Sequence, residues 1–427
     1  MNAFIGIDLG TSGCRGVVID EGGNQLAETS LPLPASRRSV SGQSEQDPET
    51  WWQGVQQILS DLAGSCGERQ IRAIAVDGTS STLLLCDREG NPLTAGLMYD
   101  DTRGGGSLAD IRRMAPEDSP VLSASSSLAK LLHLASGIGQ SDYIALHQAD
   151  WITGRLSGRY PVSDENNCLK LGYDPRSRHW PSWLTRLGLP AGCLPEVFPV
   201  ATPIGAISPP IASATGLPHE TTIVTGTTDS NAAFLATGAD QVGDAVSSLG
   251  STLVLKILSD SPVFAAEHGV YSHRLGDRWL VSGASNTGGA VCRAFFSQQE
   301  ISRLTPLMTP DQPTGLDYYP LLRPGERFPI NDSELAPRLS PRPKEDERFF
   351  QAILEGITRI EQTGYALLQR LGAPSPQRVI SIGGGALNEP WRQMREKALG
   401  VPVQRALQQE AAYGAALLAR QALSVGG

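Results

Sequence analysis

Short apolar runs alternate with turns rich in Gly, Ser and Thr at the start of the chain. Apolar residues at 4–7 lead into Asp8, residues 10–13 read Gly-Thr-Ser-Gly, and residues 17–19 are apolar again. This pattern predicts a strand, a tight turn and a second strand. A third strand is expected near residues 26–29.

A helix and a further strand are predicted next. Asp47 is a suitable N-cap and Pro48 a suitable first helical residue for an amphipathic stretch that includes Trp51 and Val55. Residues 71–76 are rich in β-branched side chains and are closed by Asp-Gly-Thr-Ser. Three strands, a helix and another strand indicate a mixed α/β order.

The second half of the chain repeats this pattern. Residues 245–255 again predict a strand, a Gly-Ser-Thr turn and a strand. The remaining predicted elements are strands at 270–272, 279–281 and 379–382 and helices at 349–371, 389–399 and 410–423. We therefore interpret the chain as a weak internal duplication with a boundary near residue 238. The Pro-rich residues 302–345 are expected to form a long, irregular surface excursion.

Composition narrows the function classes. A chain of 427 residues predicts two or three domains, and 40% apolar with 19% charged residues is a globular composition. The net charge of −9 argues against nucleic acid as a partner, because phosphate contacts need a basic face. No apolar run predicts a membrane helix or a signal peptide, and the six cysteines are scattered without CxxC spacing. We expect a cytoplasmic protein with reduced thiols and no membrane contact.

Two turns are candidate phosphate sites. Neither the P-loop pattern nor G-x-G-x-x-G after a strand is present. A tight turn of Gly, Ser and Thr can still present backbone N–H groups and hydroxyls to anionic oxygens. Residues 10–13 and 250–252 both fit this description. One such turn alone would be read as an ordinary hairpin, but two in equivalent places, with Asp8 beside the first, favour phosphate binding.

Several segments, in order along the chain, resemble the motifs of one family. Residues 4–12 resemble the first phosphate motif of the sugar kinase, Hsp70 and actin superfamily. The other motifs resemble those of the FGGY carbohydrate kinases: the catalytic-base segment at 226–229, the second phosphate motif at 248–252, the adenosine motif at 383–391 and the terminal helix at 414–419. Together they cover nearly the whole chain.

The resemblance implies a fold and a domain division. It implies an α/β fold of two actin-like (ribonuclease H-like) domains, each a mixed sheet flanked by helices, with a catalytic cleft between them. Residues 1–238, joined by the C-terminal helix 409–427, would form the sugar-binding domain with the first phosphate motif and the catalytic base. Residues 239–408 would carry the second phosphate motif and the adenosine motif.

The resemblance also implies an activity. The chain is expected to be an ATP- and Mg²⁺-dependent kinase of a ketopentose, with D-ribulose giving D-ribulose 5-phosphate as the first choice and D-xylulose as the alternative. The compact motifs at 77–80 and 226–229 most resemble the cyanobacterial and plant xylulokinase-like branch, whose members act as D-ribulose kinases. An actin- or Hsp70-like ATPase switch and a degenerate sugar sensor are the other readings. A small-molecule sugar is the expected partner, for a monomer or homodimer.

Asp229 and Asp8 are the candidate catalytic residues. Asp229 opens a helical run, where the helix dipole favours a carboxylate, so it is either the base for the sugar hydroxyl or only a helix cap. The resemblance favours the base. Asp8 ends a buried strand and suits Mg²⁺, and both aspartates are candidate metal and sugar ligands.

The remaining candidates divide by ligand. The predicted ATP contacts are Gly10, Thr11, Ser12 and Gly13 in the first turn, Gly250, Ser251 and Thr252 in the second, and Gly384, Gly385, Asn388 and Trp391 around the purine. The additional sugar candidates are Ser80, then Thr79 and Asp77, although Asp77 could simply hold its turn.

Two segments depart from the family pattern. His133 stands three residues after Lys130, where the family signature has Trp. The family's W-x-D-x-R segment is replaced by a segment that begins at Tyr99 and includes Asp101 and Arg103. This segment is expected either to flank the sugar pocket or to be a solvated surface loop.

Overall fold

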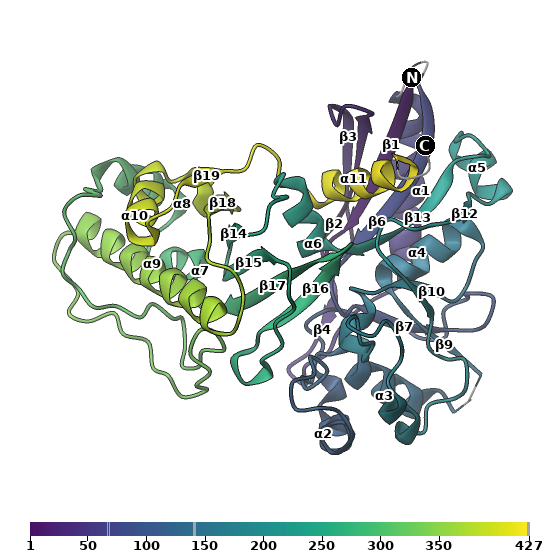
Figure 1. Cartoon of the computed structure of the whole chain (residues 1–427), viewed down its shortest axis with the longest axis horizontal. Coiled ribbons are helices and arrows are strands. Elements are labelled where there is room, and N and C mark those ends of the chain that lie inside the picture. The colour runs from purple at the N-terminus through teal and green to yellow at the C-terminus, as the bar shows by residue number, and fades with distance from the viewer. Residues whose placement is uncertain (66, 68, 140–141, 425–427) are drawn as a thin grey trace. The chain divides into compact units, whose positions relative to one another are not determined.

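The computed structural model describes residues 1–65, 67, 69–139 and 142–424, which form two compact units (Figure 1). Unit 1 contains Met1–Ala236, the short piece Arg274–Gly276 and the C-terminal segment from Glu410. Unit 2 contains Thr237–His273 and Asp277–Gln409. The chain therefore leaves unit 1 to build unit 2 and returns to unit 1 at its C-terminal end.

The main sheet of unit 1 has six strands. Its order is β12-β13-β6-β1-β2-β3. The bounds are β1 Asn2–Leu9, β2 Gly13–Asp20, β3 Gln25–Pro32, β6 Gln70–Gly78, β12 Pro203–Ala206 and β13 Thr222–Thr228. Strands β1, β6 and β13 run parallel, so their carboxyl ends lie at one edge, whereas β2, β3 and β12 are antiparallel to their neighbours.

The two faces of this sheet are covered by different helices. Successive side chains of a strand point to opposite faces. Ile5 and Ile7 of β1 share a core cluster with Trp51 and Ile58 of α1 (Pro48–Ser65), which begins at the predicted Pro48. Phe4, by contrast, packs with the alanines of the C-terminal helix α11 (Ala411–Ser424), drawn in yellow in Figure 1.

Glycine permits this close approach of α11. A Cβ atom on Gly6 would lie 1.9 Å from the carbonyl oxygen of Ala412 and 2.2 Å from the amide nitrogen of Ala416. Similarly, a Cβ atom on Gly414 would lie 1.8 Å from the carbonyl oxygen of Ala232 in α6 (Asp229–Ala236). Backbone atoms cannot give way as a side-chain tip can, so larger residues at these positions displace the helix.

We therefore expect Gly6→Val to prevent docking of α11. The added atoms would overlap backbone, and overpacking of this kind commonly costs about 1–3 kcal/mol or more. The measurement is the melting temperature, together with limited proteolysis of the C-terminal segment. Gly64→Ala is the control, because nothing lies within 4 Å of a Cβ atom there. A Gly6→Val protein with unchanged melting would contradict the packing described.

The rest of unit 1 is built around a second sheet. Its order is β4-β5-β8-β7-β9. The strands are β4 Arg37–Arg38, β5 Ser44–Gln46, β7 Leu83–Cys86, β8 Gly96–Leu97 and β9 Ile144–His147, with β10 Val162–Asp164 and β11 Glu196–Phe198 forming a separate pair. The helices are α2 Leu108–Met114, α3 Ser127–Ile138, α4 Gln148–Ser157 and α5 Pro209–Thr215, with short 3₁₀ helices η1 Arg103–Ser107, η2 Cys168–Leu171 and η3 Ser182–Leu187.

The sheet of unit 2 follows the same plan as the main sheet of unit 1. Its order is β16-β17-β15-β14-β18-β19. The bounds are β14 Asp244–Leu249, β15 Leu253–Ser259, β16 Tyr271–Leu275, β17 Arg278–Ser285, β18 Arg378–Ile382 and β19 Val403–Arg405. Strands β14, β18 and β19 are parallel, and β15 and β17 continue as antiparallel neighbours. The repeated arrangement agrees with the predicted internal duplication.

Helices and a buried ion pair hold unit 2 together. The helices are α7 Gly289–Phe295, α8 Gln298–Leu304, α9 Asp346–Arg370 and α10 Glu389–Leu399, with 3₁₀ helices η4 Ala266–His268, η5 Thr305–Leu307 and η6 Gly384–Leu387. Arg395 of α10 donates two hydrogen bonds of 2.6 Å to Glu361 of α9, and both side chains are fully buried. Ser247 and Ser381 bond to the same pair, so two helices and two strands meet there.

Residues 302–345 follow the prediction only in part. The first residues belong to α8 and η5. The remainder is irregular and mostly exposed, as predicted, but Tyr318, Leu321 and Phe328 anchor it in the core of unit 2. The carboxylate of Glu326 also accepts hydrogen bonds from Ser285 Oγ at 2.5 Å and from the Asn286 amide at 2.7 Å. A Pro-rich sequence without periodicity gives no signal of such burial.

None of the helices in the described residues is long and apolar enough to span a membrane.

Candidate active site

Three aspartates gather where parallel strands of unit 1 end. Asp8 of β1 lies opposite Asp77 of β6 in the strand register, and Asp77 lies opposite Thr227 of β13. Asp229 follows β13 directly as the first residue of α6. The sequence separates these aspartates by many residues, and the parallel register brings them to one edge.

A bulge in β13 directs the chain toward Asp229. The register between β13 and β6 shifts between Val224 and Thr227. A Cβ atom on Gly226, inside the bulge, would lie 1.8 Å from the carbonyl oxygen of Val76. Glycine is therefore required at this position, which explains the Gly in the motif before Asp229.

The three carboxyl groups influence one another electrostatically. The pKa of Asp8 is raised to about 6: burial and the charge of Asp229 raise it, whereas a hydrogen bond with Asp77 and the charge of Arg15 lower it. Burial, followed by the charge of Asp8, raises the pKa of Asp77 well above its ordinary value. Asp77 is fully buried, and apart from the contact with the Asp8 carboxyl, its oxygens accept no hydrogen bond from the described residues. Asp77 therefore does not stabilise its turn by accepting hydrogen bonds from the residues of that turn.

This arrangement predicts that Asp77→Asn stabilises unit 1 at neutral pH in the absence of ligands. A carboxyl whose pKa is raised by folding contributes stability below its unfolded value and loses it as pH rises through the folded value. For Asp8 that loss lies between pH 3.8 and about 6, and the coupled Asp77 extends it upward. The variant should melt higher than the wild type at pH 7 and similarly at pH 4.

The control is Asp244→Asn, whose carboxylate is paired with Arg378 at 2.7 Å. That ion pair holds the pKa of Asp244 below its ordinary value although burial opposes it, so its contribution is present at neutral pH and lost as pH falls. Asp244→Asn should therefore melt lower at pH 7. An Asp77→Asn protein that melts lower than the wild type at pH 7 would contradict the repulsion inferred.

The predicted sugar residues lie in the turn after β6. Gln148 Oε1 accepts hydrogen bonds from the Thr79 amide at 3.1 Å and from Thr79 Oγ1 at 3.0 Å. Thr79 is buried, so it supports the turn, whereas Ser80 is half-buried. Lys170 Nζ donates to Ser80 Oγ at 3.3 Å, and no local pattern predicts this contact.

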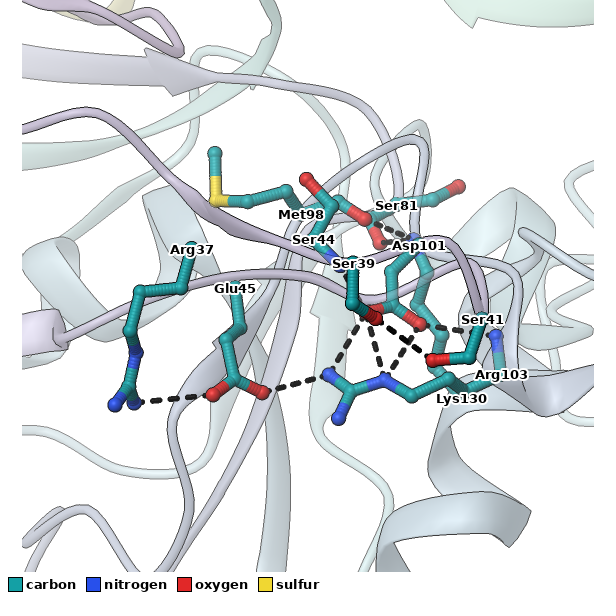
Figure 2. Close-up of polar contacts among 10 residues, drawn as sticks. All are labelled: Arg37, Ser39, Ser41, Ser44, Glu45, Ser81, Met98, Asp101, Arg103 and Lys130. Atoms are coloured by element: carbon teal, nitrogen blue, oxygen red, sulfur yellow. Dashed lines mark hydrogen bonds and ion pairs between the residues drawn. The ribbon is translucent and has the colours of Figure 1, made fainter.

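The segment after Tyr99 is an anchored structure and not a solvated loop. Asp101 is fully buried, and its Oδ2 accepts from the Ser44 amide at 2.8 Å and from Arg103 Nη2 at 2.8 Å. Figure 2 shows the guanidinium of Arg103 between Asp101 and Glu45, which accepts at 2.7 Å. Tyr99, by contrast, is exposed. These contacts join β5 to the segment, and whether the segment lines the sugar pocket stays a prediction.

The first phosphate turn is a short hairpin between β1 and β2. The Gly10 amide donates to the Gly13 carbonyl at 2.9 Å, and Gln46 Nε2 donates to the Thr11 carbonyl at 2.8 Å. Ser12 is exposed, so its hydroxyl is accessible to a ligand. The turn is thus stabilised by hydrogen bonds that its carbonyl groups accept.

The predicted adenosine residues of unit 2 surround a cavity of about 720 Å³. Six of the residues predicted for ATP line it: Gly250, Ser251, Gly384, Gly385, Asn388 and Trp391. Thr252 follows them along the chain but is not among the lining residues. The cavity is formed by residues of unit 2 alone, at the carboxyl ends of β14 and β18.

Trp391 is chiefly a core residue. Its side chain is 3% exposed, and its Nε1 donates to Thr358 Oγ1 at 2.9 Å. Asn388 caps α10, because its Oδ1 accepts from the Trp391 amide at 2.9 Å, and its Nδ2 donates to Thr305 Oγ1 at 3.4 Å. We therefore propose that Trp391 forms the wall of the cavity and does not offer an open stacking face.

The sequence analysis missed several residues of this cavity. They come from α7, α8 and α9 and include Arg293, Gln298, Ile301, Ser302 and Phe350. Arg293 Nη2 donates to Ser251 Oγ at 2.8 Å, which places a cation beside the second phosphate turn. The capping box of Ser297 and Glu300 was the available signal for α8.

Comparison with known proteins defines the class of protein. Residues 3–236 match the model of the N-terminal domain of the FGGY family of carbohydrate kinases, and residues 245–423 match the model of its C-terminal domain. The chain is therefore a carbohydrate kinase, a phosphotransferase, and it belongs to the FGGY family.

Several named relatives are similar in sequence to nearly the whole chain. It is 27% identical over 450 residues to the xylulose kinase of Bacillus subtilis, covering 98% of this chain and 88% of the relative. It is 26% identical to the xylulose kinase of Escherichia coli, covering 92% and 84%. A gluconokinase of Bacillus subtilis is 23% identical, covering 92% and 82%.

Solved structures confirm the predicted α/β fold with two sheet-containing, actin-like domains. A ligand-bound xylulose kinase from Lactobacillus acidophilus superposes with a TM-score of 0.88 at 21% identity, covering 100% of this chain and 90% of the other. A Plasmodium falciparum glycerol kinase with ADP gives the same TM-score at 17% identity and the same coverage. The predicted cleft between the two domains stays a prediction.

Proposed function

We propose that the protein transfers the γ-phosphoryl group of ATP to a ketopentose, with D-ribulose as the first candidate and D-ribulose 5-phosphate as its product. The observation that carries the proposal is the set of three aspartates at the carboxyl ends of adjacent parallel strands. Phosphoryl transfer needs a base for the attacking hydroxyl and groups that position phosphates. Family membership favours this activity over an ATPase switch.

The residues of unit 1 would act on the sugar. Asp229 is half-buried and would accept the proton of the attacking hydroxyl as it bonds to phosphorus. Ser80, held at 3.3 Å by Lys170, would donate or accept a hydrogen bond with another hydroxyl of the sugar. Thr11, Ser12 and the adjacent glycines would contact the phosphates.

The residues of unit 2 would hold the nucleotide. Gly384 and Gly385 allow a flat purine to approach the backbone, and the cavity of about 720 Å³ is large enough for a nucleoside. Arg293 and Ser251, bonded at 2.8 Å, lie where the phosphates would leave the cavity toward the second turn.

The aspartates also fit Mg²⁺. Burial raises the pKa of Asp8 and Asp77, the charge of Asp229 raises both further, and a divalent cation would relieve this repulsion between carboxylates. In the part of the chain that is described, no three His, Cys, Asp or Glu side chains are grouped to hold a metal by themselves. Mg²⁺ commonly takes one or two carboxylates and completes its shell with phosphate and water. Asp8 and Asp229 would hold it, and it would neutralise phosphate charge.

D-xylulose is the second candidate, because several relatives are xylulose kinases. The test is a coupled ADP-release assay with D-ribulose, D-xylulose, gluconate and glycerol, each scored by kcat/KM. The proposal expects the highest value with D-ribulose, and the highest value with D-xylulose would support the second candidate. Highest turnover with gluconate or glycerol, or with none of the four, would refute a ketopentose substrate.

A further inference from the structure

Two of the five lysines of the chain have their ammonium groups on one turn. Lys170 contacts Ser80, as described above, and Lys130 contacts the next residue, Ser81. Lys130 lies in the first turn of α3 and its side chain is fully buried. Its Nζ donates to the Ser81 carbonyl at 2.7 Å and to the Met98 carbonyl at 2.7 Å (Figure 2).

The two carbonyls belong to segments that are far apart in sequence. Ser81 follows the turn residues Thr79 and Ser80, which are candidates for sugar binding. Met98 directly precedes the segment anchored by Asp101. Lys130 therefore links the turn at residues 79–81, called the sugar turn below, to the segment 99–103 through the two hydrogen bonds of its side chain.

Ser81 is held in a conformation that serine seldom adopts. Its φ angle is 68°, in the left-handed region that favours glycine. Its hydroxyl has no hydrogen-bond partner in the described part of the chain, so the side chain does not stabilise this conformation. The carbonyl of Ser81, by contrast, accepts the hydrogen bond from Lys130 Nζ.

We propose that Lys130 is a positioning residue for the sugar: by holding the Ser81 carbonyl, it keeps Ser80 oriented toward the substrate. The inference rests on the proposed function, in which Ser80 contacts the sugar. Burial lowers the pKa of Lys130 to about 7, and the ammonium and the neutral amine both have enough N–H groups for two carbonyls. The clamp therefore does not depend on the charge of the side chain.

The first test is Lys130→Met, which keeps the apolar stem and removes the donor. Because the sugar turn is then free to relax, KM for the sugar should rise about tenfold, while KM for ATP and the unfolding of unit 2 stay unchanged. Lys130→Gln, whose amide retains two N–H groups, should show a smaller rise in KM for the sugar. It replaces Lys130→Met in the test if the methionine variant does not fold.

The second test separates positioning from general destabilisation. Glycine adopts a positive φ without strain, so Ser81→Gly should restore most of the sugar KM when combined with Lys130→Met. Lys256→Met is the matched control, since Lys256 is a buried lysine of unit 2 and should leave the sugar KM unchanged.

Two results would overturn the proposal: a normal sugar KM in folded Lys130→Met, or a double variant no better than the single one. Wild-type turnover tests the proposed function separately. If the wild type prefers another sugar, KM of each variant is compared with KM of the wild type for that sugar. If it phosphorylates none, hydrogen exchange of the amides at 79–82 decides, because Lys130→Met should speed their exchange and Lys256→Met should not.

Discussion

Asp229→Asn is expected to lower kcat for sugar phosphorylation by at least about 10²-fold, the scale of losing a general base. Asp229 is the first residue of α6, and the side-chain oxygen of asparagine can still accept from the Ser230 amide, as Asp229 Oδ1 does at 2.6 Å. The substitution therefore removes the base and can retain this hydrogen bond. KM for ATP should change little, because the nucleotide cavity lies in unit 2.

The measurement is steady-state kinetics with the sugar that the wild type prefers, together with a melting curve. Asp47→Asn is the matched control, because Asp47 accepts from the Glu49 amide at 3.1 Å at the start of α1 and has no part in the site. Asp229→Asn with near-normal kcat would show that Asp229 only begins α6.

Arg395→Met is expected to destabilise unit 2 by about 3–5 kcal/mol, the usual cost of removing one partner of a buried ion pair. The variant leaves Glu361 fully buried without its bidentate partner and removes the bond from Arg395 Nη1 to Ser381 Oγ at 2.7 Å. Since α10 carries one wall of the nucleotide cavity, binding of ATP should weaken with it.

Denaturant unfolding followed by tryptophan fluorescence would measure this loss, because Trp391 lies on α10 close to Arg395. Arg392→Met is the control on the same helix: Arg392 pairs with Glu389 and Glu396 at the surface, and such pairs contribute about 0–1 kcal/mol. Equal losses in the two variants would contradict the role given to the buried pair.

Local signals in the sequence were enough for most elements of the fold. The apolar run before Asp8, the β-branched residues at 71–76 and the stripe at 349–371 correspond to β1, β6 and α9. Each of these patterns arises from a single element, whose period and end signals lie within a few residues of one another. Residues 309–345 have no such period, so the burial of Tyr318, Leu321 and Phe328 within this mostly exposed segment could not be predicted.

The candidate site was predictable only as a set of separate motifs. Asp77 was ranked below Ser80 because nothing local shows that β6 pairs with β1 so that Asp77 meets Asp8. Likewise, the contact of Lys130 with Ser81 depends on how α3 packs on the turn, which no periodicity encodes. The hydrogen bond of Trp391 to Thr358 is likewise not visible in the sequence, and a contact of Trp391 with the purine stays a prediction.

The return of α11 to unit 1 determines the order in which the units can mature during translation. A ribosome making 5–20 residues per second needs roughly 9–35 s to add the chain between Ala236 and Glu410. Throughout that time, the face of the main sheet that includes Phe4 and Val17 has no α11 to cover it. Unit 2 has its whole sequence at the end of this interval, before α11 is made. Unit 2 can therefore finish folding first on the nascent chain, whereas unit 1, although most of it is synthesised earlier, stays incomplete until the last helix emerges.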